Sequence, residues 1–340
     1  MKHILVVTGT LVIFSFLVWG ILNTSSHITF IKPELAQAIN VIPKTVVIPK
    51  ETTILFGGDV MLSRGIDDVM RKHHDFNYPF YQIRDVIAGA DIAIVNLESP
   101  ISLKGRDVGS IYSFRADPRA AFGLAFAGID VVSLANNHAG DYGSEALTDT
   151  IRILRNMGIG VVGAGENMLM ANAPLLINVN DITIALFSST PIAPSWFTRK
   201  DSMPAIAHLN ESVLTENISK AREQGADIVA VLLHWGNEYE TTHLASQEAI
   251  AHNLIDAGAT LVIGHHPHVV QEVEKYHGGV IAYSLGNLVF DQNFSEDTRH
   301  GLLLKVTLRG KNIANVEEIP IRFSNNYQPY MEYSAIYPIK

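Results

Sequence analysis

The chain has 340 residues, of which 47% are hydrophobic and 17% charged, and its formal net charge is −9 at pH 7. This composition excludes a largely disordered chain, and the acidic balance argues against a general nucleic-acid-binding protein, which normally carries a basic face. Cysteine is absent, so disulfides, thiolate catalysis and cysteine-based zinc sites are excluded as well.

An uncharged apolar stretch runs from Ile4 to Leu22. At about 1.5 Å of rise per residue, a helix of this length approaches the ~30 Å hydrocarbon core of a bilayer. Lys2 is the only charged side chain before it, so residues 1–22 are predicted to be an uncleaved, single-pass signal anchor with the bulk of the chain outside the cytoplasm. Cleavage with secretion and a buried soluble helix are the alternatives.

Residues 23–52 are predicted to be a linker, because Pro33, Pro43 and Pro49 interrupt any helix there. A globular domain is then predicted over residues 53–325, followed by a C-terminal tail over residues 326–340.

Within this domain, short apolar runs typical of buried strands alternate with helical segments of period 3.6. The predicted strands cover residues 53–58, 91–97, 129–135, 158–164, 174–179, 182–189, 227–235, 259–264, 279–286 and 302–308. The predicted helices cover residues 143–158, 210–225 and 242–258. Alternating strands and helices indicate a layered α/β domain, and the closely spaced last strands indicate an antiparallel portion.

Unusual polar residues follow many of the predicted strands. They are Asp59, Asn96, Glu98, Asn136, Asn137, His138, His234, His265, His266, His268 and Asn287. Ligands of open α/β sheets bind outside the C-terminal ends of the strands, so we expect these residues to converge. Imidazole, carboxylate and amide oxygen are ligands for Zn, Mn or Fe, and the pattern predicts a site for one or two divalent ions.

The spacing in the sequence HHPH predicts on which side of the segment each histidine side chain lies. On an extended segment, His266 and His268 lie on the same side and can bind one ion or two adjacent ions. His265 then faces the other way, toward the surroundings of the ligands or a substrate. The cluster can also be an ordinary surface loop.

The other residues have ordinary structural explanations too. Asp59 suits a turn or a helix N-cap, and Asn136 and Asn137 suit turns. His234 suits a hydrogen-bonded core position, and Glu98 a solvated loop. A shared site is favoured because all of these residues follow predicted strands.

Seven motifs in order resemble the CapA/PgsA family of poly-γ-glutamate capsule proteins. They are ILFGGDVMLSRG, DIAIVNLESPIS, YSFRADP, DVVSLANNHAGDYG, LLHWGNEY, VIGHHPHVVQ and YSLGNLVFDQ. The resemblance extends from about residue 53 to residue 290. That family is similar in turn to calcineurin-like metallophosphoesterases, which implies a four-layer αββα sandwich with a two-metal site.

The resemblance also implies roles for individual residues. The implied metal ligands are Asp59, Asn137, His234, His266 and His268, with Glu98 in place of a bridging aspartate. His138 is implied to be the acid that protonates a leaving group. Met61 stands where the pattern has a histidine, and its thioether is a poor ligand for such ions, so the number of ions stays open at one or two.

Two classes of function follow. The first is a metal-dependent hydrolase or transferase acting on the γ-amide of polyglutamate or on a phosphoester. The second is a non-catalytic accessory protein that binds the polymer or its synthase. The expected partners are poly-γ-glutamate or another anionic polymer, the membrane and capsule synthase subunits, and not nucleic acid. An acidic domain needs bound cations or a basic patch to hold such a polymer, and Arg64, Arg115 and Arg119 are the candidates for that patch.

Overall fold

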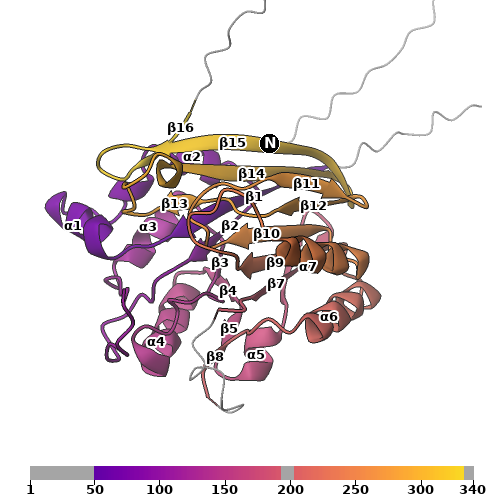
Figure 1. Ribbon diagram of the computed structural model, residues 1–340, viewed down its shortest axis with the longest axis horizontal. Helices are drawn as coiled ribbons and strands as arrows, with labels where there is room; N and C mark the ends of the chain where they lie inside the picture. Colours follow the sequence, from indigo (N-terminus) through magenta and orange to yellow (C-terminus); the bar gives the residue numbers. More distant parts are fainter. Residues whose placement is uncertain (1–49, 193–202, 333–340) are drawn as a thin grey trace, which may run out of the picture. The chain divides into compact units, whose positions relative to one another are not determined.

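The computed structural model describes residues 50–192 and 203–332 (Figure 1). The predicted signal anchor over residues 1–22 lies outside these ranges, as does the predicted linker up to residue 49. Within the described part of the chain, no helix combines the length and the apolar character needed to cross a bilayer.

The first sheet has eight strands in the order β16-β15-β14-β1-β2-β3-β4, with β13 also paired to β1. These strands are β1 (Glu51–Val60), β2 (Ile92–Leu97), β3 (Val131–Ser133), β4 (Gly160–Val162), β13 (Asn287–Val289), β14 (His300–Arg309), β15 (Asn312–Phe323) and β16 (Pro329–Met331). Strands β1 to β4 run parallel. Strands β14, β15 and β16 pair antiparallel, which confirms the predicted antiparallel portion.

The second sheet has six strands in the order β11-β12-β10-β9-β7-β6, and β5 pairs with β8 in a small separate ladder. The strands are β5 (Ala164–Gly165), β6 (Leu175–Val179), β7 (Ile182–Ser189), β8 (Ala205–Ile206), β9 (Ile228–His234), β10 (Leu261–His265), β11 (Val273–Tyr276) and β12 (Gly279–Ala282). Its central strands β7, β9, β10 and β12 are parallel.

Helices connect many of these strands. They are α1 (Arg64–Lys72), α2 (Arg84–Ala88), α3 (Ala120–Ala127), α4 (Gly143–Asn156), α5 (Met168–Asn172), α6 (Glu211–Glu223) and α7 (Ala245–Asp256), with 3₁₀ turns η1 (Tyr78–Phe80) and η3 (Asp297–Arg299). The three predicted helices correspond to α4, α6 and α7.

The two sheets pack face to face through an apolar layer. Ile54 and Ile94 of the first sheet belong to the same buried cluster as Leu186, Leu232 and Ile263 of the second. Because successive side chains of a strand point to opposite faces, alternate residues of each strand fill this layer.

The remaining apolar side chains of the strands face helices. Leu55 of β1 packs in a cluster with Leu147 of α4 on the outer side of the first sheet. Val231 of β9 packs with Ile218 of α6 and Leu254 of α7 on the outer side of the second (Figure 1). The order of layers is therefore helix, sheet, sheet and helix, and burial on both faces explains the nearly continuous apolar runs of the central strands.

Several elements of the structure were not predicted from the sequence. Helix α3 is apolar at nearly every position, so it has no amphipathic period to detect. Strand β15 is mostly exposed and therefore lacks a buried apolar run. The sheet also continues past residue 325, where a tail is predicted, because β16 pairs with β15 through Ile321 and Met331.

Between β12 and β13, residues 283–286 cross from the second sheet to the first. Along this crossing segment, the amide of Leu285 donates to the carbonyl of Gly264 on β10 at 3.2 Å. The carbonyl of Gly286 accepts from the amide of Asp59 on β1 at 3.0 Å. One short stretch of backbone thus holds the C-terminal ends of β1 and β10 together.

Two glycines make this close approach of backbones possible. A Cβ atom at Gly264 would lie 1.8 Å from the carbonyl oxygen of Tyr283. A Cβ atom at Gly58 would lie 2.0 Å from the carbonyl oxygen of Gly286. Neither distance is compatible with any side chain, so the crossing segment requires glycine at both positions.

We expect Gly58→Ala to destabilise the protein by roughly 3 kcal/mol or more, since the new methyl group meets backbone that cannot move aside. The matched control is Gly57→Ala, whose Cβ would meet the side-chain ends of Leu288 at 2.8 Å and Val95 at 3.1 Å. These side chains can shift, so the control should lose only about 1–2 kcal/mol. Urea denaturation measures both values, and an equal loss in the two variants would contradict the role of the crossing segment.

Candidate metal centre

Strand pairing places the predicted polar residues at one end of the two sheets. In the first sheet, Asp59 lies beside Asn96 of β2 and beside Asn287 of β13. In the second sheet, His265 of β10 lies beside His234 of β9. The crossing segment joins these two ends, so residues far apart in sequence surround a common centre.

The Asp59 carboxylate is fully buried at this centre. It accepts hydrogen bonds from Asn96 Nδ2 at 2.8 Å and from the amide of His266 at 3.1 Å. The Nδ1 atoms of His265 and His268 each lie 3.3 Å from one of its oxygens. Burial opposes its ionisation, but these two histidines outweigh burial and hold the pKa of Asp59 well below its usual range.

A chain of side-chain amides surrounds this carboxylate. Asn96 accepts from Asn136 Nδ2 at 3.0 Å, and the same Nδ2 also donates to the carbonyl of Leu97 at 2.8 Å. The Asn136 oxygen accepts from the amide of His138 at 3.1 Å. These bonds fix the turn that follows β3.

Two further amides lie against histidine rings. Asn137 Oδ1 is 2.8 Å from His234 Nε2. Asn287 Oδ1 is 3.0 Å from His268 Nδ1, and its Nδ2 donates to the carbonyl of His268 at 3.3 Å. The contact between Asn287 Oδ1 and His268 Nδ1 sets the orientation of the His268 ring, with Nε2 directed away from Asn287.

The Glu98 carboxylate has no hydrogen bond from any residue in the described part of the chain, although it is fully buried. Its Oε1 lies 3.7 Å from His234 Nε2, 3.7 Å from His268 Nε2 and 3.9 Å from His138 Nε2. A buried carboxylate without a partner is costly in a folded protein. A cation among these atoms would satisfy it.

Burial shifts the protonation equilibria of several groups at the centre. Burial and the nearby charge of Asp59 raise the pKa of Glu98 well above its usual range. Burial and the neighbouring His266 lower the pKa of His234 well below its usual range. Burial and the neighbouring His268 lower the pKa of His266 to about 3. His234 and His266 are therefore neutral at physiological pH, which is the form that binds metal ions.

Three overlapping sets of side chains are spaced to hold an ion, each with ligand atoms within 4.8 Å of one another. The sets are Glu98, His234 and His266; Asp59, Glu98 and His268; and Glu238, His266 and His268. Glu98 belongs to two sets, as expected for a carboxylate between neighbouring ions. Glu238 was missed from the sequence because it lies in an exposed loop several residues after β9 ends.

The predicted extended conformation of HHPH is wrong. Strand β10 ends at His265, and His266 and His268 have positive φ angles of 97° and 59°. The two rings still converge, with centroids 5.9 Å apart. His265 contacts Asp59 directly and does not face away. Positive φ is uncommon for residues with a side chain and is often found at functional sites.

Met61 stands where the pattern of calcineurin-like metallophosphoesterases has a histidine. Its sulfur accepts hydrogen bonds from the amide and the hydroxyl of Ser63, at 3.1 and 3.0 Å. The residue is fully buried in the apolar cluster beneath the helices. Met61 therefore contributes packing where the pattern has an imidazole.

His138 is held by two contacts on its ring. Its Nδ1 is 2.8 Å from a carboxylate oxygen of buried Asp141, and its ring stacks on Phe114 with centroids 3.9 Å apart. Both contacts orient Nε2 toward Glu98. Asp141 was missed from the sequence, although its position three residues after His138 in NNHAGD is a usable signal.

Two of the three candidate arginines for a basic patch are paired with carboxylates. Arg64 pairs with Asp291, and Arg119 forms two hydrogen bonds with Asp117. Arg115 lies over an aromatic ring at 4.1 Å and does not line the pocket above the centre. Of the three arginines, Arg64 alone reaches that pocket.

The pocket opens directly over the centre and has a volume of about 250 Å³. Its lining consists of Arg64, Tyr112, Phe114, His138, Glu238, Tyr239, His268, Asp291, Gln292 and Phe294. Aromatic rings therefore form much of its wall, with His138 and His268 at the side of the candidate metal ligands. A substrate group in this pocket can reach both the centre and His138.

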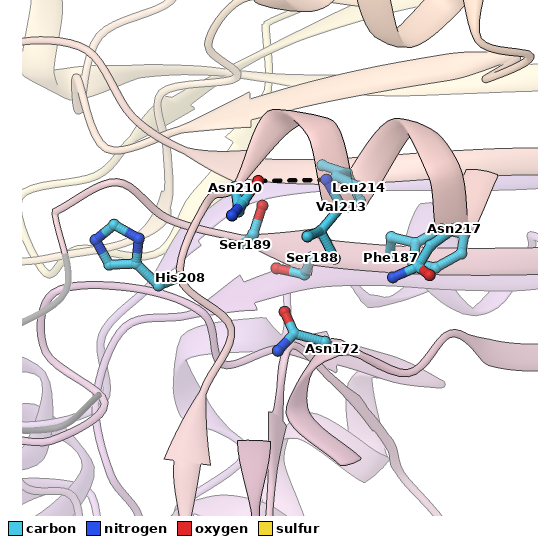
Figure 2. Close-up of a pocket in the computed structure, with 9 residues that line it drawn as sticks. All are labelled: Asn172, Phe187, Ser188, Ser189, His208, Asn210, Val213, Leu214 and Asn217. Carbon is cyan, nitrogen blue, oxygen red and sulfur yellow. Dashed lines mark hydrogen bonds between the residues drawn. The ribbon is translucent and has the colours of Figure 1, made fainter. Parts of the chain in front are cut away.

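A second hollow lies elsewhere, between α5, β7 and the start of α6 (Figure 2). Asn172, Ser188 and Ser189 are among the residues that line it, and Asn210 caps α6 by accepting from the amide of Val213 at 3.3 Å. Its volume of about 20 Å³ has room for about one water molecule. The pocket over the centre is the candidate binding site, because His138, Glu238 and His268 line it.

Comparisons with a protein family and with individual proteins both relate the chain to capsule biosynthesis proteins. Residues 53–292 match the family described as "Bacterial capsule synthesis protein PGA_cap". The chain is 32% identical over 279 residues to the capsule biosynthesis protein CapA of Bacillus anthracis, covering 80% of this chain and 67% of that protein. It is also 32% identical over 274 residues to the PGA biosynthesis protein CapA of Bacillus subtilis, covering 78% and 70%.

Among solved structures, a protein described as a novel phosphatase from Mycoplasma pneumoniae has a similar fold. The TM-score is 0.51 with 15% sequence identity, and the match covers 81% of this chain and 95% of that chain. At this level of identity, the similarity concerns the arrangement of sheets and helices.

Glu98→Gln should have opposite effects with and without metal. In metal-free protein at neutral pH it should stabilise the fold by roughly 1–3 kcal/mol, because the native protein must otherwise either bury a charge without a partner or take up a proton at Glu98. The raised pKa of Glu98 predicts that this gain shrinks as pH falls toward the pKa of an exposed glutamate, since the unfolded chain then binds the same proton as the native protein. With Mn²⁺ or Zn²⁺ added, the variant should lose the metal-induced rise in melting temperature that the unaltered protein shows.

Thermal unfolding in chelator and in metal measures both effects, and Glu166→Gln is the control because that carboxylate is exposed. A variant that is destabilised without metal, and stabilised by metal as much as the unaltered protein, would contradict the assignment of Glu98.

Proposed function

Because this chain belongs to the family of bacterial capsule synthesis proteins described as PGA_cap, we propose that it is a metal-dependent protein of poly-γ-glutamate synthesis or export. The main support for a metal ion is Glu98. Its buried carboxylate has no hydrogen bond among the described residues and faces three imidazole nitrogens. The support for the polymer comes from the relatives' names, since two of them are described by capsule or PGA biosynthesis.

The donor set fits one or two ions of Zn, Mn or Fe. The proposed ligands are Asp59, Glu98, Asn137, His234, His266 and His268, with Glu238 as a further candidate at the pocket side. His265, Asn96 and Asn287 contact these ligands and hold their orientation, and Asn136 in turn holds Asn96.

His138 is the proposed general acid. A divalent ion bound at the centre would polarise a carbonyl or phosphoryl oxygen and lower the pKa of a bound water. With Asp141 accepting from Nδ1, the Nε2 of His138 faces the pocket and can give its proton to a leaving nitrogen or oxygen. We propose the γ-amide of the polymer as the reacting bond, because the relatives are named for capsule and PGA biosynthesis, and a phosphoester is the second candidate.

Charge makes polymer binding depend on the ions. Arg64 is the only arginine among the described residues that line the pocket, and Asp291 already neutralises it. Asp59 adds negative charge beneath, and Glu238 adds it at the wall. A polyanion is repelled from this pocket until bound cations reverse the local charge, so metal removal should abolish binding of the polymer.

A set of variants separates catalysis from simple binding. His138→Ala should retain metal and lower turnover by roughly 10²–10⁴-fold, the usual effect of removing a positioned acid. Asp141→Asn should lose part of this activity, because the ring is then less well oriented. His266→Ala/His268→Ala should lose the metal itself. The readouts are metal content by elemental analysis and γ-linked polymer per cell at equal protein levels.

His73→Ala is the matched control, because His73 also stacks on an aromatic ring with centroids 3.9 Å apart but is exposed and distant from the centre. If polymer is made normally with His138→Ala and lost with the double variant, the protein binds polymer without catalysing its reaction. Normal polymer with both would refute a role for the centre.

The apolar N-terminal stretch supports a proposal about location. Residues 1–22 would hold the protein in the cell membrane by one span, with the domain on the outer side, because Lys2 favours a cytoplasmic N-terminus. External protease added to intact protoplasts should then digest the domain. Full protection of the domain, with digestion only after lysis, would contradict this topology.

A further inference from the structure

Aromatic side chains stand exposed at the mouth of the pocket. Phe294 is 64% exposed and Tyr239 44%, and their rings meet edge to face with centroids 5.0 Å apart. Tyr112, on another loop that lines the same pocket, is 67% exposed. Apolar groups gathered in this way on a surface commonly mark a binding site.

Tyr239 is held in place at the edge of the metal centre. Its φ angle is 66°, which is strained for a residue with a side chain. Its amide donates to the carbonyl of Pro267 at 2.8 Å, and its hydroxyl accepts from Gln292 Nε2 at 3.3 Å. The ring centroid lies 6.2 Å from that of His268. The backbone strain thus positions an aromatic ring next to the proposed ligands.

Phe114, another aromatic residue that lines the pocket, already has partners within the protein. Phe114 stacks on His138, and the guanidinium of Arg64 lies 4.6 Å from its centroid. Tyr239 and Phe294 meet edge to face, so one ring face is covered by the edge of the other ring, and the exposed remainder of both rings is available to a ligand. Beside them, the exposed carboxylate of Glu238 offers a hydrogen-bond acceptor.

We infer that Tyr239 and Phe294 form an aromatic clamp that binds the γ-glutamyl residue next to the one reacting at the metal centre. A γ-linked chain repeats two methylenes, an amide and a carboxylate. Its methylenes suit the ring faces, its amide N–H suits Glu238, and the carboxylate or amide of the adjacent residue reaches the ions. This inference rests on the proposed function, because it takes the polymer as the ligand.

The clamp predicts that binding strengthens with chain length. Calorimetry on the full-length protein in detergent, loaded with Mn²⁺, compares free glutamate with a short oligomer of γ-linked glutamate. The unaltered protein should bind the oligomer more tightly. Tyr239→Ala and Phe294→Ala should each weaken oligomer binding by roughly 10-fold, as expected for the loss of a buried aromatic contact, and leave glutamate binding nearly unchanged.

Two further variants make the result specific. Tyr239→Phe keeps the ring and should retain most of the gain from chain length. Phe122→Ala removes a ring of similar exposure, 56%, on α3 away from the pocket and should change nothing.

Oligomer binding that is unaffected by Tyr239→Ala and Phe294→Ala would overturn the clamp and leave the proposed function standing. An unaltered protein that binds the oligomer no better than glutamate would also overturn the clamp. The proposed function fails separately, if cells carrying His266→Ala/His268→Ala make normal amounts of polymer.

Discussion

The backbone contact between the crossing segment and the ends of β1 and β10 holds the two halves of the centre together. Asp59 comes from one sheet and the HHPH histidines from the other, and the apolar layer between the sheets does not by itself fix their separation. The carbonyl of Gly286 and the amide of Leu285 fix it through hydrogen bonds of ordinary length. Side-chain contacts then orient groups that backbone contacts have already brought within reach.

Electrostatics gives this arrangement its chemical character. Asp59 is ionised because histidines surround it, whereas Glu98 is buried without a single hydrogen bond. His234 and His266 are kept neutral by burial. A site with one ionised carboxylate, a second carboxyl group without a partner and uncharged imidazoles favours a cation, and the large hydrophobic core beneath it supplies the stability that the unsatisfied Glu98 removes.

Much of the fold and of the candidate centre could be predicted from the sequence, because buried parallel strands are continuous apolar runs and their C-terminal ends share one edge. The ends of these runs indicate Asp59, Asn96 and the histidines as site residues. Glu238 could not be predicted in this way, because it lies in a loop whose path depends on tertiary contacts. The conformation of HHPH was predicted wrongly, because positive φ at non-glycine residues has no local signal. The pairing of the arginines with carboxylates from distant segments was equally beyond the reach of local patterns.

The amide chain through Asn96 and Asn136 has a consequence for how the protein ages. Each amide gives its nitrogen to one neighbour and its oxygen to the next, so the chain has a single direction from the His138 backbone to Asp59. Deamidation of Asn136 would replace its nitrogen by an oxygen that faces the Asn96 oxygen and the carbonyl of Leu97. Chemical damage at a residue that binds no ion would then reverse the polarity of its neighbours and loosen the carboxylate at the far end.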